Sequence, residues 1–189
     1  MLAKQKVSRF QLLRRGLGSN AGEGLRPPYA VSDADFVDLC DRSGRCIKAC
    51  PEGIVVRGSG QFPTIDFSRG ECTFCLDCVK ACQSGALKNE SSGATHSENQ
   101  LNISEPEPWD YKAVIDANCL SANGVTCRVC GDVCDTRAIK FRLALGGKAF
   151  PEITLIDCTG CGACVAPCPT KSITIETPTI EEIERRENA

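Results

Sequence analysis

Short apolar stretches alternate with turn-forming residues along the chain and predict small strands instead of long helices. The expected strands form two hairpins, each followed by a closing strand: residues 54–57, 64–67 and 86–87, then residues 139–143, 153–156 and 172–176. The first hairpin turns at Gly58-Ser59-Gly60 and the second at Gly146-Gly147. The pattern therefore predicts two similar units, one after the other.

Helix signals are few and short. Ser32, with Asp35 three residues later, predicts the cap of a helix that runs towards Cys40. Helices are also expected at residues 8–15 and from Thr179 onward. The prolines at the start of the first unit predict an extended segment at residues 26–29, since proline disfavours helix in the residue before it.

Cysteine is the dominant chemical feature, with fifteen cysteines and one histidine in 189 residues. Most of the cysteines lie in repeated Cys-x2-Cys-x2-Cys-x3-Cys runs, of which two are complete and a third is stretched at its start. In the first run, Ser43 stands where a cysteine is expected. The candidate metal ligands are Cys40, Cys46, Cys50, Cys72, Cys75, Cys78, Cys82, Cys119, Cys127, Cys130, Cys134, Cys158, Cys161, Cys164 and Cys168. Three thiolates at this spacing on one tight loop can hold three irons of a cubane cluster, so the runs predict [4Fe–4S] clusters.

Two other uses of cysteine fit the pattern less well. A disulfide framework needs an oxidising compartment and usually an even number of cysteines. Zinc sites favour paired Cys-x2-Cys knuckles, often with histidine. The only histidine, His96, lies in a polar stretch and is expected to be solvated instead of bound to metal.

The spacing resembles that of bacterial two-cluster ferredoxins, in which the fourth cysteine of a run ligates the other cluster. This resemblance implies four ligand sets: Cys40, Ser43, Cys46 and Cys82; Cys72, Cys75, Cys78 and Cys50; Cys119, Cys127, Cys130 and Cys168; and Cys158, Cys161, Cys164 and Cys134. Three of the clusters are expected to be complete.

Ser43 leaves the first cluster with a flawed ligand set. One interpretation is a lost ligand, with a three-iron, labile or absent cluster. The other is a missing or weak ligand that leaves one iron of the cluster exchangeable, which would suit cluster donation or sensing. A serine alkoxide can also bind iron, but sulfur is the favoured donor at such sites.

Composition and charge narrow the function further. Aromatic residues make up only 5% of the chain, so the core is expected to be thin and cluster binding to supply much of the folding free energy. A net charge of −2 and the lack of a basic patch argue against nucleic-acid binding. No stretch is long enough to span a membrane, and no export signal follows Arg14-Arg15, so a cytoplasmic location is expected. The sequence offers no pair of residues suited to act as catalytic acid and base, so the protein is not expected to be an enzyme.

These features predict an α+β fold of two tandem bacterial-type 2[4Fe–4S] ferredoxin-like modules, small and stabilised by their clusters. The expected parts are a basic flexible leader (1–30), module 1 (31–90), a polar linker (91–108), module 2 (109–177) and an acidic C-terminal helix (178–189). Trp109 and Tyr111 are expected to pack against the first strand of module 2. Gly131, Gly160 and Gly162 are expected to let backbone N–H groups approach the sulfurs.

Beyond the spacing, residues 26–175 resemble the NapF family, the cytoplasmic accessory ferredoxins of the periplasmic nitrate reductase system. The resemblance is carried by Arg26-Pro27-Pro28-Tyr29, Phe62-Pro63, Cys72-Thr73-Phe74-Cys75, the long gap from Cys119-Leu120 to Cys127-Arg128, and Cys158-Thr159-Gly160-Cys161-Gly162-Ala163-Cys164. The stretched third run is the most specific of these features, and Ser43 departs from the family pattern.

The resemblance implies an accessory protein that binds the unexported catalytic subunit of periplasmic nitrate reductase and assists the maturation of that subunit's [4Fe–4S] cluster. An alternative is a multi-cluster ferredoxin that supplies electrons to a reductase. A third possibility is a subunit of a larger redox complex.

Overall fold

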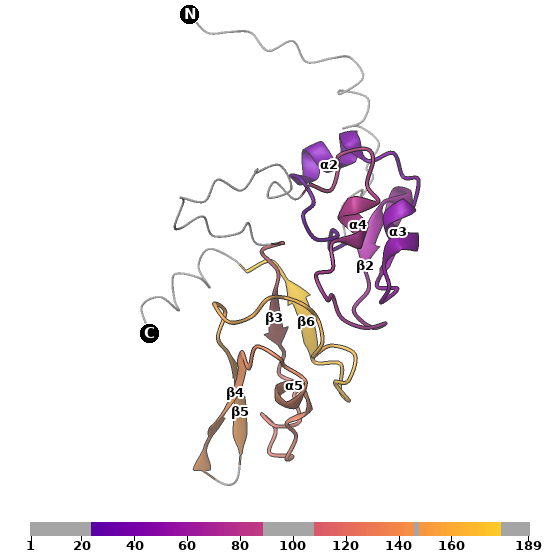
Figure 1. Ribbon diagram of the computed structural model, residues 1–189. Helices are drawn as coiled ribbons and strands as arrows, with labels where there is room; N and C mark the ends of the chain where they lie inside the picture. Colours follow the sequence, from indigo (N-terminus) through magenta and orange to yellow (C-terminus); the bar gives the residue numbers. More distant parts are fainter. Residues whose placement is uncertain (1–23, 89–107, 146–147, 179–189) are drawn as a thin grey trace, which may run out of the picture.

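The computed structural model describes residues 24–88, 108–145 and 148–178. We refer to residues 24–88 as the first half and to residues 108–178 as the second half. The strands form three antiparallel sheets of two strands each, and all the helices are short. Figure 1 shows the first half in indigo to magenta and the second half in orange to yellow. The expected mixture of helices and small sheets is present.

The first half places three short helices around one hairpin. Its elements are α2 (Asp33–Leu39), α3 (Arg45–Ala49), β1 (Val55–Arg57), the 3-10 turn η1 (Ser59–Gln61), β2 (Pro63–Ile65) and α4 (Asp77–Lys80). The predicted hairpin is confirmed, but β2 ends at Ile65. The chain turns there because the carboxylate of Asp66 accepts hydrogen bonds from the N–H and the hydroxyl of Ser68.

The predicted helix cap is also confirmed. Ser32 is the N-cap of α2, and its hydroxyl oxygen accepts a hydrogen bond from the Asp35 N–H at 3.3 Å. This bond satisfies one of the backbone donors that the first turn of a helix leaves unpaired. The same helix buries Phe36 completely.

The second half is built mainly from strands. Its elements are β3 (Lys112–Ile115), α5 (Val129–Asp132), β4 (Ile139–Leu143), β5 (Ala149–Ile153) and β6 (Ile173–Glu176). β3 pairs with β6, and β4 pairs with β5. The closing strand is confirmed as β6, whereas the corresponding segment of the first half makes only a bridge between Ala30 and Leu87.

The strand predicted at residues 153–156 is wrong. β5 ends at Ile153, and the chain then turns, because the carbonyl of Thr154 accepts hydrogen bonds from the N–H groups of Asp157 and Cys158. The segment at residues 26–29 also departs from its predicted extended form. Tyr29 lies in a turn with φ 60°, where its N–H donates to the Pro108 carbonyl at 2.6 Å and its own carbonyl accepts from Lys88. These long-range bonds outweigh the local preference.

The main apolar core takes residues from both halves. From the first half come Ile54, Val55, Ile65 and Phe67, and from the second half Trp109, Ala113, Ala138, Ile139, Ile173 and Ile175. Trp109 reaches across to the first half, with its ring centroid 6.0 Å from that of Phe67 and 5.4 Å from that of Phe74. It therefore packs on more than the first strand of its own half. A smaller core around Phe36 and Phe62 lies within the first half.

The predicted helices at residues 8–15 and from residue 179, and the linker with His96, lie outside the described residues. Within the described ranges, no helix is long and apolar enough to cross a membrane.

Candidate metal centres

All fifteen cysteines are free thiols, and they lie in groups. The second thiol group (Cys50, Cys72, Cys75 and Cys78) surrounds an open cavity with about 350 Å³ of free space. Cys50 caps the end of α3 and Cys78 lies within α4, so two helices and the loop between Cys72 and Asp77 bring the four thiols together. Ile54 and Ile65 are part of the apolar wall. The sequence predicted this grouping.

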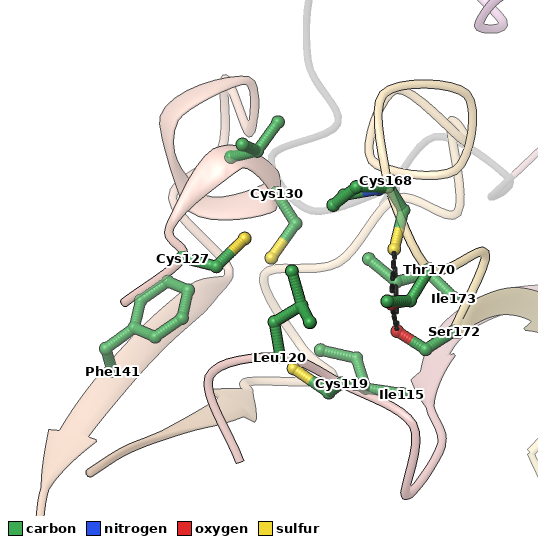
Figure 2. A pocket seen from close by; sticks show the side chains of 12 residues that line it. Ile115, Cys119, Leu120, Cys127, Cys130, Phe141, Cys168, Thr170, Ser172 and Ile173 are labelled. Carbon is green, nitrogen blue, oxygen red and sulfur yellow. Dashed lines mark hydrogen bonds between the residues drawn. The ribbon is translucent and has the colours of Figure 1, made fainter. Parts of the chain in front are cut away.

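The third thiol group (Cys119, Cys127, Cys130 and Cys168) surrounds a similar cavity with about 340 Å³ of free space. Figure 2 shows its sulfurs approaching from three separate segments of the second half. Leu120, Ile115 and Phe141 line the cavity beside them. The nine-residue stretch from Cys119 to Cys127 therefore still brings both thiols to one place.

The first thiol group consists of Cys40, Cys46 and Cys82, which all pack against the smaller core of the first half. Burial is the main cause that raises the pKa of Cys46 to about 11, and the charges of Cys40 and Cys82 add to it. Ser43, the predicted weak ligand of this group, is exposed. Its hydroxyl donates to Oδ1 of Asp41 at 2.8 Å, and its N–H donates to the same atom at 3.0 Å.

The fourth thiol group contains Cys158, Cys161 and Cys164. Burial raises the pKa of Cys164 to about 12, and the charges of Cys161 and Cys158 contribute next. Cys134, the predicted fourth member, packs against the same apolar core as Cys158 and Cys164. Its sulfur lies 3.6 Å from the hydroxyl oxygen of Thr136. Membership of Cys134 in this group stays a prediction.

Neighbouring groups lie close enough for their charges to interact. Burial raises the pKa of Cys78 in the second group to about 12, with a smaller contribution from Cys46 in the first. Cys130 of the third group contributes in the same minor way to the raised pKa of Cys164 in the fourth.

The two halves meet at the second and fourth groups. The Cys72 N–H donates to the Cys161 carbonyl at 2.8 Å. Burial raises the pKa of Cys72 to about 11, and Cys161 is among the smaller causes. The groups therefore follow one another in the order first, second, fourth, third.

Three of the cysteine loops share one backbone conformation. Two and four residues after the first cysteine, the chain has positive φ: Arg42 and Gly44, Phe74 and Leu76, and Gly160 and Gly162. Since Phe74 and Leu76 adopt this conformation, φ alone does not require glycine in the last loop. A Cβ at Gly162 would overlap the Phe67 ring, and one at Gly160 would overlap the Tyr111 carbonyl. Close contact with neighbouring segments therefore gives these glycines a packing role, whereas their predicted role in N–H approach to sulfur stays a prediction.

Hydroxyl groups lie beside the fourth cysteine of three runs, and the one beside Cys134 is that of Thr136. Ser172 is buried, and its Oγ lies 3.4 Å from the Cys168 sulfur, as Figure 2 shows. The Ser84 Oγ lies 3.5 Å from the Cys82 sulfur, which also accepts from the Leu87 N–H. Burial raises the pKa of Cys168 and Cys82, but these hydrogen bonds outweigh it, so each pKa is lowered overall.

The donor set fits an iron–sulfur cluster. Soft thiolate sulfur is the usual ligand of such clusters, and the second and third groups each put four thiols around one cavity. In the part of the chain that the structure describes, no three Cys, His, Asp or Glu side chains converge on the position of a single metal ion. Thiols with raised pKa values would release protons on metal binding.

Sequence reasoning missed two kinds of residue at these centres. One is Asp41, which binds the hydroxyl of Ser43. The other is the hydroxyl residue two positions after the last cysteine of three runs, namely Ser84, Thr136 and Thr170. The recurring Cys-x-Ser/Thr pattern was a signal that could have found these hydroxyls.

Comparison with known proteins adds to this geometry. A family model described as a 4Fe-4S dicluster domain matches residues 39–87. The chain is 35% identical over 161 residues to the ferredoxin-type protein NapF of Escherichia coli strain K12, an alignment that covers 85% of this chain and 90% of that protein. It is 40% identical over 152 residues to the ferredoxin-type protein NapF of Haemophilus influenzae, covering 80% and 78%.

More distant similarity extends to another ferredoxin-type protein. The methylamine utilization protein MauM of Methylorubrum extorquens is 30% identical over 159 residues, covering 77% of this chain and 68% of that protein. No solved structure matches the chain.

Proposed function

Because the chain belongs to the NapF family of ferredoxin-type iron–sulfur proteins, we propose that it assists maturation of the periplasmic nitrate reductase. In this role it binds the unexported catalytic subunit in the cytoplasm and helps to install that subunit's own [4Fe–4S] cluster. The observation that supports the proposal is the placement of four thiols around each of two separate cavities.

Each half would be one ferredoxin-like module with two thiol groups. The second and third groups would hold a cluster through Cys50, Cys72, Cys75 and Cys78, and through Cys119, Cys127, Cys130 and Cys168. The fourth would use Cys158, Cys161 and Cys164 with Cys134. When bound, [4Fe–4S] clusters supply one-electron redox chemistry.

The chain's own residues position the thiols and place apolar groups beside them. Apolar side chains such as Ile54, Ile65 and Ile115 wall the cavities, and burial raises the pKa of Cys78 and Cys164. No step in this role requires a catalytic acid or base.

The test of the maturation role is the iron content of the nitrate reductase catalytic subunit purified from cells with and without this protein. We expect the iron content to fall when the protein is missing and to recover when the gene is returned. A subunit with full iron content in the deletion strain would contradict the role.

A second function, electron supply to a reductase, is favoured by one observation. The thiol groups form a continuous series in which the second and fourth groups meet at the Cys72–Cys161 hydrogen bond. Closely spaced redox centres are what electron transfer through a protein requires.

The two functions differ in the partner they prefer. A maturation factor should bind the catalytic subunit more tightly before that subunit has its cluster than after. An electron carrier should bind both forms alike, and its loss should slow nitrate reduction without lowering the subunit's iron content. Co-purification with cluster-free and cluster-loaded subunit separates them.

A further inference from the structure

The loop from Cys40 to Cys46 keeps the backbone of a thiol-bearing loop although one thiol is missing. Ser43 lies between two residues of positive φ, Arg42 (56°) and Gly44 (73°), as Cys75 lies between Phe74 and Leu76. Positive φ strains the backbone of a non-glycine residue such as Arg42. The surrounding contacts of the loop must offset this strain. At these two positions its backbone thus has the positive φ of the complete loops, although the residue between them carries a hydroxyl instead of a thiol.

Three thiols remain at this place. Cys40 and Cys46 come from the loop and from α3, Cys82 follows α4, and all three pack against the same small core. Cys82 is held by hydrogen bonds with the Ser84 hydroxyl and the Leu87 N–H. The first group therefore consists of three half-buried thiols, and the fourth ligand position is occupied by the hydroxyl of Ser43.

Asp41 determines what the oxygen at that position can do. Its carboxylate accepts both the hydroxyl and the N–H of Ser43 through one oxygen atom, and its other oxygen lies 3.7 Å from the Arg45 guanidinium. To bind iron as an alkoxide, Ser43 would have to lose its hydroxyl proton and break this bond. A hydroxyl already donating to a carboxylate stays protonated, and a protonated oxygen is a poor ligand beside three thiolates.

We propose that the first thiol group is a three-iron site: Cys40, Cys46 and Cys82 hold a [3Fe–4S] cluster, and the corner at Ser43 has no protein ligand because Asp41 retains the serine hydroxyl. The proposal rests on the proposed role of the thiol groups as cluster ligands. It separates this site from the second and third groups, where four thiols surround each cavity.

The test is electron paramagnetic resonance of the oxidised full-length protein, purified without oxygen, together with its iron-to-protein ratio. The oxidised three-iron cluster is paramagnetic, whereas oxidised [4Fe–4S]²⁺ clusters are silent. We expect the three-iron signal in the unchanged protein and in Ser43→Ala, because the hydroxyl is not a ligand. Ser43→Cys should lose the signal and gain about one iron atom per chain, since a fourth thiolate completes the set.

Two matched variants locate the signal. Cys46→Ala removes a thiol of the first group and should abolish it. Cys127→Ala in the third group should leave it and, because that group then also has three thiols, should add a second signal of the same kind. A signal that survives Cys46→Ala would come from another site and would overturn the proposal. A signal that appears only in Ser43→Ala would show that serine does bind iron, which also overturns it.

Failure of the broader function gives a different result. If no variant contains iron and sulfide, the cluster-binding role itself is wrong. If clusters are present but neither the signal nor the extra iron of Ser43→Cys is found, only the three-iron assignment is wrong.

Discussion

The two halves carry similar cysteine runs on unequal frameworks. In the first half, the hairpin strands β1 and β2 have three residues each, the closing segment makes a single bridge, and α2 covers the thiols with Phe36. In the second half, β4 and β5 have five residues each, and β3 pairs with β6 over four. The comparison teaches that the cysteine loops determine where the thiols lie, while either a helix or a sheet can support them.

The two halves also differ in the second ligand position of a cysteine run. Ser43 in the first half and Cys161 in the second lie between two residues of positive φ, yet only one of them carries sulfur. Loop shape is therefore not a consequence of the thiol at that position.

Removal of the clusters should produce the largest effect and should expose the difference between the frameworks. We expect an iron chelator under reducing conditions to unfold most of the chain, because ligation holds together segments that share a thin core. The paired strands of the second half should lose protection last. Hydrogen exchange followed by mass spectrometry measures this, and equal loss of protection in both halves would contradict it.

Gly162→Ala tests the contact between the two halves and should lower the stability of the protein. The added methyl group would overlap Phe67, and overpacking of this kind costs about 1–3 kcal/mol beyond the cost of positive φ. Denaturation of the loaded protein, followed by circular dichroism, measures the loss. The control is Gly53→Ala, which has φ 65° but no atom near its Cβ and should lose only about 1 kcal/mol. Equal losses would mean that the contact with Phe67 contributes nothing.

Ser32→Ala tests the helix that the first half uses as support. Loss of the hydrogen bond to the Asp35 N–H should cost about 1 kcal/mol and should speed amide exchange in α2. Exchange in β3 and β6 should stay the same, which makes the second half the internal reference. Ser59→Ala, at an exposed serine of η1, is the matched control and should change neither the stability nor the amide exchange of α2.

Ser172→Ala and Ser84→Ala should give the smallest effects, as shifts in reduction potential. A hydrogen bond to a ligand sulfur stabilises the more negative, reduced cluster, so its removal should lower the potential. For Ser172, a loss of about 1 kcal/mol corresponds to on the order of 40 mV for one electron. Ser84→Ala should lower the potential in the same way, with Cys82 keeping the hydrogen bond from Leu87 as Cys168 keeps that with Thr170. Potentiometric titration measures both, and a higher potential in Ser172→Ala would refute the assignment.

Much of the local structure was predictable, because it follows from interactions between residues close in sequence. The cap at Ser32, the hairpin around Gly58-Ser59-Gly60 and the strand at Ile173–Glu176 follow from capping residues, turn residues and alternation. At residues 153–156 the error is a local turn, in which the Thr154 carbonyl accepts from the Asp157 and Cys158 N–H groups. At Tyr29 the backbone is set by hydrogen bonds with the distant residues Pro108 and Lys88. Local preference could not reveal those partners.

The sequence by itself determined which atoms are available as metal ligands and in what spacing, since covalent order places the thiols on tight loops. It also determined that a thiol is missing at Ser43. The hydrogen bond between Asp41 and Ser43 joins residues two positions apart on one loop. Only the tertiary structure decided why Gly160 and Gly162 are glycines, through contacts with Tyr111 and Phe67. The reason is physical: ligand type is a property of each side chain, whereas hydrogen-bond partners and close contacts depend on which segments meet.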